Sequence, residues 1–99
     1  MKILLILITF ASFYHSKFEG RKTANGEIFY NNNLTAAYNH VPLNSVLKVT
    51  NIKNNKSLIV VVNDRCGINS RIDLSQKAFS SIGKLKSGII KVKIEKIQL

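Results

Sequence analysis

The amino-acid sequence predicts a small all-β barrel that carries one short helix. Two segments, 45–51 and 88–97, alternate apolar and polar side chains, which is the period of a strand buried on one face. A third segment, 58–62, is a continuous apolar run bounded by polar residues, as in a buried strand. Convincing helical spacing of apolar side chains is found only at 75–82, and 99 residues suit one domain. Several short strands joined by long irregular connections therefore favour a closed all-β fold.

The chain begins with a positive charge followed by an apolar stretch. Lys2 precedes segment 3–10, in which only Thr9 is polar. A short apolar run after a basic start is typical of a secretory signal peptide, and it is too short to span a bilayer. We expect residues 1–10 to form a signal peptide or apolar leader with an uncertain boundary, and residues 11–99 to form the domain. The alternative is that part of this run is the first barrel strand.

The next part of the chain predicts short elements and loops before a regular hairpin. We expect a short strand at 11–14, a polar loop at 19–26, an extended segment at 27–30 and a turn at the asparagine run 31–33. Segment 34–38 is short and mixed. Segments 45–51 and 57–63 flank Asn54-Asn55, residues that tolerate a positive φ, so these two segments are expected to pair as a β-hairpin.

The predicted helix follows Ser75, a good N-cap because its hydroxyl can accept a hydrogen bond from the first turn. Its apolar face consists of Ala78, Phe79 and Ile82, and a glycine at position 83 ends it after about two turns. Asp73 could cap the same helix, and we interpret it as a structural residue. Segment 88–97 then returns as a strand.

The chain is strongly basic. Fifteen Lys and Arg residues against five Asp and Glu residues give a formal net charge of +10. This balance favours a polyanionic partner, such as nucleic acid, anionic lipid or an acidic cell-wall polymer. The basic residues are scattered from Lys2 to Lys96 without a dense run, so no nucleic-acid footprint is visible. A merely solvated basic surface is an equal alternative.

Asp64 stands where the apolar run ends and a loop begins. A carboxylate held at the mouth of a rigid strand is placed as a catalytic acid needs to be. The alternative is structural: a salt bridge with Arg65 or Arg71, or a turn. Cys66 is the only cysteine, which excludes an internal disulfide, suggests no metal cluster and leaves a packed thiol or a nucleophile as its roles.

Several short motifs occur in a fixed order along the chain. They are Ala11-Ser12-Phe13-Tyr14, Phe18 to Glu27, Leu34-Thr35-Ala36-Ala37, Pro42-Leu43, Val46 to Asn51, Val61 to Arg65 and Ile72-Asp73-Leu74-Ser75. This set resembles the rare lipoprotein A (RlpA) family over about residues 11–97. The resemblance implies a six-stranded double-psi β-barrel related to expansin and barwin domains. It also implies a periplasmic or envelope-bound lytic transglycosylase that acts on peptidoglycan glycan strands, prefers strands lacking stem peptides, and needs no cofactor or metal.

The resemblance assigns the family's acid to Asp64 and a second residue implicated in activity to Glu27. In lytic cleavage the sugar's own 6-hydroxyl attacks the anomeric carbon and closes a 1,6-anhydro ring. One acid/base can therefore serve both steps, unlike the two carboxylates of a hydrolase. We expect Asp64 to be that acid/base and Glu27 to orient or polarise the substrate. Because a nearby cation favours the charged carboxylate, this role requires the Arg65 side chain to point away.

The chain departs from the family pattern at two positions. Tyr38 stands where the family has a histidine, and His40 follows two residues later, so strand parity could keep it on the same face. Cys66 follows the arginine where the family has Gly-Pro. We expect His40 to hydrogen-bond substrate or to tune Asp64.

The remaining candidate site residues are polar or aromatic side chains that we expect to contact the glycan: Tyr14, Asn25, Tyr38, Asn63 and Arg65. For the tyrosines the alternative is core or rim packing. For the asparagines it is a hydrogen bond within a turn.

Three functions from different classes are compatible with these observations. The leading one is the secreted lytic transglycosylase, and the second is a non-catalytic, expansin-like module that binds cell-wall glycan. The third is an intracellular basic barrel that binds nucleic acid, which requires the apolar leader to be a strand. We expect peptidoglycan glycan strands as the partner, no nucleic acid, a monomer, and envelope or outer-membrane association without a lipid-anchor cysteine.

Overall fold

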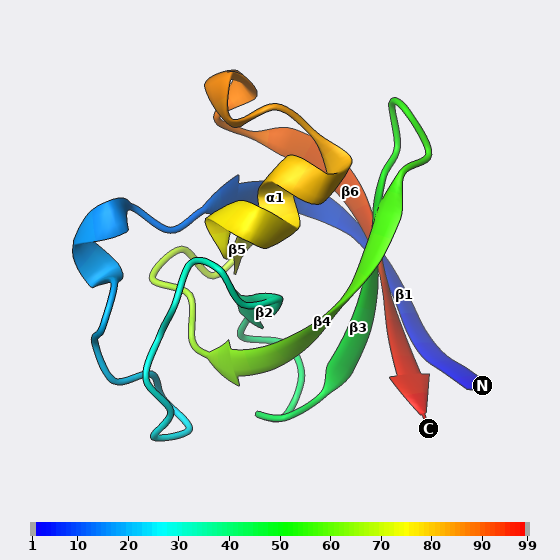
Figure 1. Cartoon of the computed structure of the whole chain (residues 1–99). Helices are drawn as coiled ribbons and strands as arrows, with labels where there is room; N and C mark the ends of the chain where they lie inside the picture. The colour runs from blue at the N-terminus through cyan, green and yellow to red at the C-terminus, as the bar shows by residue number, and fades with distance from the viewer. Residues whose placement is uncertain (1, 99) are drawn as a thin grey trace.

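Six strands form a closed barrel whose order in space differs from their order along the chain. The computed structural model describes residues 2–98. Around the ring the strands follow the order β1-β5-β2-β4-β3-β6 (Figure 1). A six-stranded barrel with one α-helix confirms the predicted fold class. Along the chain the elements are β1 (Lys2–Phe13), the 3-10 helix η1 (Ser16–Phe18), β2 (Thr35–Ala37), β3 (Val46–Asn51), β4 (Ser57–Asp64), β5 (Arg71–Leu74), α1 (Gln76–Ile82), the 3-10 helix η2 (Leu85–Ser87) and β6 (Ile90–Gln98).

Two parallel pairs determine where the strand ends meet. β1 pairs in parallel with β5 and β2 with β4, whereas the other four pairs are antiparallel. Ala37, the last residue of β2, lies opposite Asp64 of β4 on one side and opposite Asp73 of β5 on the other. Two interstrand spacings separate the backbones of the two aspartates, which is roughly 10 Å. The topology therefore places two carboxylates on either side of one small residue.

Alternating side chains of the strands fill the barrel. Leu47 and Val49 of β3 are fully buried, whereas Lys48 between them faces outward, as the alternation predicts. β3 and β4 form the predicted antiparallel hairpin. Phe79 of α1 enters the core and contacts Phe13 edge-on, with ring centroids 4.9 Å apart. The helix thus closes the core against the strands that carry the aspartates.

The helix begins as predicted, but the segment before it does not cap it. Ser75 is the N-cap, and its Oγ atom accepts a hydrogen bond from the N–H of Ala78 at 3.1 Å. Asp73 instead belongs to β5, a strand that the sequence pattern did not predict. The segment expected to be extended at 27–30 forms only an isolated bridge between Lys22 and Ile28.

β1 is longer than expected and includes the apolar start of the chain. Its residues pair with β6 in antiparallel register along nearly the whole strand, so β6 has a partner on both sides. The boundary expected between residues 10 and 11 therefore falls inside β1, as in the alternative that the apolar run is the first barrel strand. The outward face of this strand exposes Ile6, Ile8 and Phe10. The leader role of residues 1–10 stays a prediction, and residue 1 lies outside the described part.

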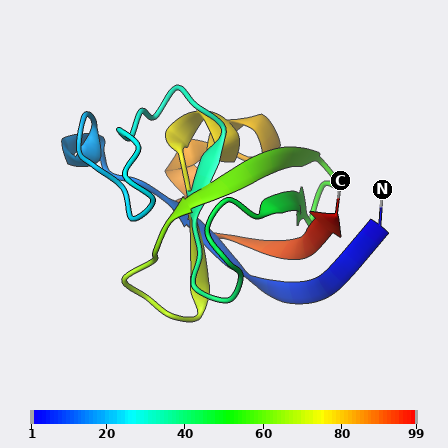
Figure 2. The same cartoon turned by 90° about the horizontal axis from the view of Figure 1, so that it is seen from below.

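The longest irregular connection, residues 14–34, projects from the barrel on the side away from the two chain ends (Figure 2).

Within residues 2–98, no helix has both the length and the apolar character needed to cross a membrane.

Candidate functional site

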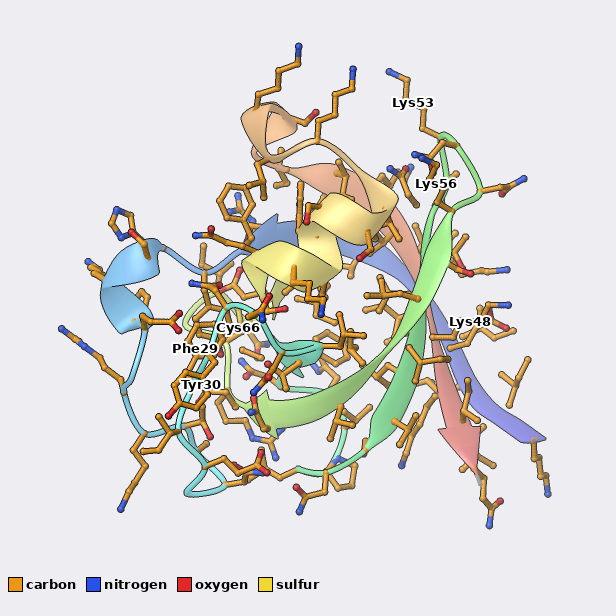
Figure 3. All side chains as sticks on the ribbon, viewed as in Figure 1. Phe29, Tyr30, Lys48, Lys53, Lys56 and Cys66 are labelled. Atoms are coloured by element: carbon orange, nitrogen blue, oxygen red, sulfur yellow. The ribbon has the colours of Figure 1, made fainter. Side chains whose placement is uncertain are left out.

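The connection 14–34 is fixed to the barrel by a second, smaller apolar cluster. Tyr14 and Phe29 stack with ring centroids 4.0 Å apart, and both pack with Ala37 and Cys66. Phe18 meets the Tyr14 ring edge-on, with ring centroids 5.8 Å apart. Figure 3 shows Phe29 and Cys66 near one another in front of the barrel wall. This packing holds the loop segment 23–27 against the end of β4.

Asp64, the last residue of β4, has a carboxylate fixed by three hydrogen bonds. Its Oδ2 atom accepts one from the Tyr14 hydroxyl at 2.7 Å. Its Oδ1 atom accepts two from backbone N–H groups, Ala24 at 3.0 Å and Arg65 at 2.9 Å. Burial, and then the hydrogen bond and charge of Asp64, raise the pKa of Tyr14 well above its ordinary value. The Tyr14 hydroxyl is therefore a permanent donor at neutral pH, and its side chain is too buried to present a face to a sugar.

The Arg65 side chain points away from Asp64. Its Nη1 atom donates to the backbone carbonyls of Tyr38 at 2.8 Å and Val41 at 2.7 Å. Within residues 2–98, no ion pair joins Asp64 to Arg65 or Arg71. The guanidinium thus ties two loops together. The acid role of Asp64 requires that the Arg65 side chain point away from it, and this requirement is met.

A second carboxylate, that of Asp73, lines the same hollow as Asp64. The hollow has a volume of about 530 Å³ and is also lined by Ser12 and Tyr14. Asp73 accepts hydrogen bonds from the Ser12 hydroxyl and from the Sγ atom of Cys66, the latter at 3.4 Å. Sequence reasoning missed this residue because it interpreted Asp73 as a helix cap. The proximity of Asp73 to Asp64 follows from the register of β5 against β2, and the local sequence carries no information about that register.

The Cys66 thiol is a packed side chain. It is buried, and burial raises the pKa of the thiol to about 11. A thiol with this pKa is protonated at neutral pH and is a poor nucleophile. Within residues 2–98, no group of three His, Cys, Asp or Glu side chains is arranged to hold a metal ion.

Glu27 is joined to two of the predicted site asparagines. Its Oε1 atom accepts hydrogen bonds from the Nδ2 atoms of Asn25 at 2.9 Å and Asn63 at 3.2 Å. Glu27 and Asn63 line a second hollow of about 470 Å³, whose wall includes the exposed side chain of Tyr30. Two buried side-chain oxygens of this hollow's residues, Asn63 Oδ1 and Thr35 Oγ1, have no hydrogen-bond partner in the described part of the chain.

One loop segment touches both hollows. Ala24 donates to Asp64, and Glu27, three residues later, accepts from Asn63. The two predicted catalytic carboxylates are therefore brought to neighbouring sites on one surface, each tied to the same short stretch of chain.

The structure does not bring His40 or Tyr38 into these hollows. Tyr38 is only 2% exposed and belongs to the main core, so it cannot contact a glycan in this conformation. His40 is exposed, and its Nε2 atom lies 2.7 Å from the backbone carbonyl of Asn69, to which it can only donate. Both residues line a third hollow of about 300 Å³, together with residues of β1. Preserved strand parity did not place His40 beside Asp64, because β2 ends at Ala37.

Solved structures with the same arrangement of strands define the class of the fold, the double-psi β-barrel. The papain inhibitor of Streptomyces matches with a TM-score of 0.80 at 21% sequence identity, covering 97% of both chains. An expansin of Clavibacter michiganensis, solved in complex with cellohexaose, matches with a TM-score of 0.73 at 19% identity, covering 95% of this chain and 51% of the expansin. At these identities the likeness shows the fold.

The family follows from sequence comparison. A family model described as lytic transglycolase matches residues 9–94, so the chain belongs to that family. The endolytic peptidoglycan transglycosylase RlpA of Pasteurella multocida is 50% identical over 91 residues, which is 90% of this chain and 31% of that protein. RlpA of Campylobacter jejuni is 48% identical over 89 residues, 88% of this chain and 32% of that protein. The chain thus spans about a third of the length of these relatives. A Synechocystis protein, ssl3177, is 40% identical over 87 residues, 88% of this chain and 94% of its own length.

Proposed function

We propose that this chain is a lytic transglycosylase that cleaves peptidoglycan glycan strands, prefers strands lacking stem peptides and leaves 1,6-anhydro-muramic ends. Membership of the lytic transglycolase family and the names of its RlpA relatives support the reaction class. The observation that carries the proposal is the Asp64 carboxylate, which three donors orient in a hollow while the guanidinium of Arg65 is turned away.

In the proposed reaction Asp64 acts first as an acid and then as a base. Its protonated carboxyl gives the proton to the glycosidic oxygen as the bond from that oxygen to the anomeric carbon breaks. The 6-hydroxyl of the same sugar attacks the anomeric carbon, closes the anhydro ring and returns a proton to the Asp64 carboxylate. The cycle consumes no water and needs no second catalytic carboxylate.

The neighbouring residues are assigned supporting roles. Tyr14 is a positioning residue, since its hydroxyl holds one carboxylate oxygen of Asp64. Glu27 orients substrate hydroxyls in the second hollow, and the amides of Asn25 and Asn63 fix its carboxylate. In this conformation the proposal assigns no step to His40.

We also propose that the protein acts in the cell envelope, because the names of its relatives refer to peptidoglycan, and that it acts there as a monomer. The apolar start of the chain supports export. N-terminal sequencing of the exported protein tests whether residues 1–10 are removed, as in a signal peptide, or kept, as in β1.

The experiment that tests the activity is digestion of purified, peptide-free glycan strands with mass spectrometry of the products. The wild type should release fragments with 1,6-anhydro-muramic ends. Asp64→Asn should lower their rate of formation by about 10²- to 10⁴-fold, the contribution typical of a general acid/base. Unfolding of both proteins is measured alongside, because the amide replaces an acceptor oxygen by a donor. Equal product from a folded Asp64→Asn protein would remove Asp64 from the acid role.

A second candidate function is a non-catalytic module that binds cell-wall glycan. Tyr38 in place of the family's histidine favours it, as does the fold likeness to an expansin bound to cellohexaose. Glycan strands that are bound but remain intact in the same digestion would select this function.

A further inference from the structure

The proposed reaction leaves most of the positive charge of the chain without a role. Four of the five acidic residues lie on the connection 14–34 or line the hollow of Asp64: Glu19, Glu27, Asp64 and Asp73. The fifth, Glu95, forms an ion pair with Lys93 at 3.6 Å. Four acidic side chains are therefore concentrated at one end of the barrel, while the lysines at the other end, apart from Lys93, form no ion pair within the described residues.

Three of these lysines lie at a cleft at the opposite end of β4. The cleft has a volume of about 450 Å³ and lies between the β3–β4 turn and the segment that joins α1 to β6. It is lined by Lys53, Lys84 and Lys91, and none of its lining residues is acidic. Figure 3 shows Lys53 at the tip of the turn, far from Cys66 at the other end. Because β4 runs the distance between them, the cleft and Asp64 are roughly 23 Å apart.

Hydrogen bonds that do not involve the ammonium groups build this cleft. The Nδ2 atoms of Asn51 and Asn54 both donate to the carbonyl of Ile82, the last residue of α1, at 2.8 and 3.0 Å. The Oδ1 atom of Asn51 accepts from the N–H of Lys53 at 3.0 Å. The last carbonyl of the helix thus receives its hydrogen bonds from side-chain amides, and the lysine charges are free for a ligand. A set of like charges on a preformed surface attracts an anion.

We propose that this cleft binds carboxylate groups of peptidoglycan stem peptides, which holds the protein on the polymer whose bare glycan the proposed function cleaves. This inference rests on the proposed function for the choice of polymer. Lysine ammonium groups are compact charges on flexible stems that can pair with carboxylates in varied positions, and the chain shows no dense basic run of the kind that follows a nucleic-acid backbone. A strand that is bare at Asp64 and carries peptides some 23 Å away would occupy both sites.

The test is co-sedimentation with purified sacculi, in an Asp64→Asn background so that the polymer is not cut. The cleft variant carries Lys53→Gln, Lys84→Gln and Lys91→Gln. The control variant carries Lys22→Gln, Lys77→Gln and Lys96→Gln, which lie outside the cleft. Each set removes three positive charges, and Asp64→Asn removes one negative charge, so both variants change the net charge from +11 in the Asp64→Asn parent to +8. A second arm uses sacculi whose carboxylates have been converted to amides, and a third measures binding of the parent to inorganic polyphosphate in the absence of sacculi.

The cleft variant should bind sacculi roughly tenfold more weakly than the parent at low salt, and the control variant should bind within about twofold of it. The parent should lose binding to amidated sacculi to a similar extent, and its binding should weaken as salt rises. Equal loss in both variants would reduce the effect to net charge and overturn the proposal. Undiminished binding to amidated sacculi would overturn it as well. If polyphosphate binds the parent while sacculi do not, the ligand is a phosphate polymer.

The result of the sacculus-binding test can be distinguished from the result of the glycan digestion that tests the proposed function. Cleavage of peptide-free strands by the protein with Asp64 intact is measured independently. Binding through the cleft without cleavage would reject the enzyme and keep the anion site, whereas cleavage with unchanged binding of the cleft variant would reject the site alone.

Discussion

The two ends of β4 are built by different forces. At the Asp64 end, a long connection is held down by aromatic packing, and the hydrogen-bond donors to the carboxylate come from that connection. At the Ser57 end, the β3–β4 turn is held to the helix by amide side chains on one carbonyl. Chemistry at the Asp64 end therefore depends on apolar packing some distance from the reacting group. At the Ser57 end, loss of one of these amide hydrogen bonds should lower the stability of the fold and leave cleavage unchanged.

The largest effect is expected from opening the aromatic cluster. Phe29 is buried and stacks on Tyr14, so Phe29→Ala should lower the free energy of unfolding by about 3–5 kcal/mol. Because Tyr14 and Ala24 both bind Asp64, product formation per folded molecule should also fall. Urea unfolding and the glycan digestion measure the two effects. The neighbouring exposed Tyr30 is the control, and Tyr30→Ala should change stability by no more than about 0.5 kcal/mol. Full activity of folded Phe29→Ala would show that the loop is not needed to orient Asp64.

The next effect concerns the buried thiol beside Asp73. Burial raises the pKa of Cys66 from 9.0 to about 11, so the folded state holds this proton more tightly than the unfolded chain. The resulting stability is complete below pH 9 and is lost as the pH rises towards 11, by at most roughly 2.7 kcal/mol. Urea unfolding of wild type and Cys66→Ala between pH 8 and 11 measures this loss, which the variant should lack. Alkylation of the native protein at pH 8 should be slow, and rapid alkylation would contradict the packing of the thiol.

A smaller effect is expected at the opposite end. Asn51 is 5% exposed and uses its amide for hydrogen bonds to both Ile82 and Lys53, so Asn51→Ala should cost about 1–3 kcal/mol of stability. Asn54→Ala is the matched control, because Asn54 donates to the same carbonyl from an exposed position and should cost less. Neither change should alter cleavage per folded molecule. A drop in cleavage would show that the two ends are coupled.

The smallest expected effect is a difference in stability between Thr→Val changes at two threonines near the Asp64 end. The hydroxyl of Thr35 has no hydrogen-bond partner among residues 2–98, so Thr35→Val should be neutral to within about 0.5 kcal/mol. The hydroxyl of Thr23 lies 2.8 Å from Asn25 Oδ1, so Thr23→Val should cost about 1 kcal/mol. Thermal unfolding of the pair measures this. Equal losses would mean that Thr35 has a hydrogen-bond partner in solution.

The parts of the fold that could be predicted from sequence are those whose signal is local. The alternation in β3 and the serine before α1 identify a hairpin and a capped helix, because neighbouring residues alone set a strand's faces and a helix's first turn. β5 escaped prediction because it has only four residues and both of its strand partners, β1 and β2, are distant in the chain.

The candidate site shows the same limit. Asp64 could be proposed from its place after an apolar run together with the family motif, but the direction of Arg65 depends on carbonyls of residues 38 and 41. Asp73 was misinterpreted because its proximity to Asp64 exists only across β2. His40 was expected to keep its face by parity, a rule that holds within a strand and does not extend beyond Ala37, where β2 ends.

The pairing of the first strand with the last has a consequence for how the barrel can be joined to other domains. Lys2 lies opposite Gln98, so the two ends of the described chain are neighbours, on the side away from the connection 14–34 (Figure 2). A unit whose ends adjoin can be inserted into a surface loop of a host protein, or extended from either end, without stretching its own backbone. Such fusions leave the carboxylate-lined face uncovered, which suits a barrel that accounts for only about a third of its longer relatives.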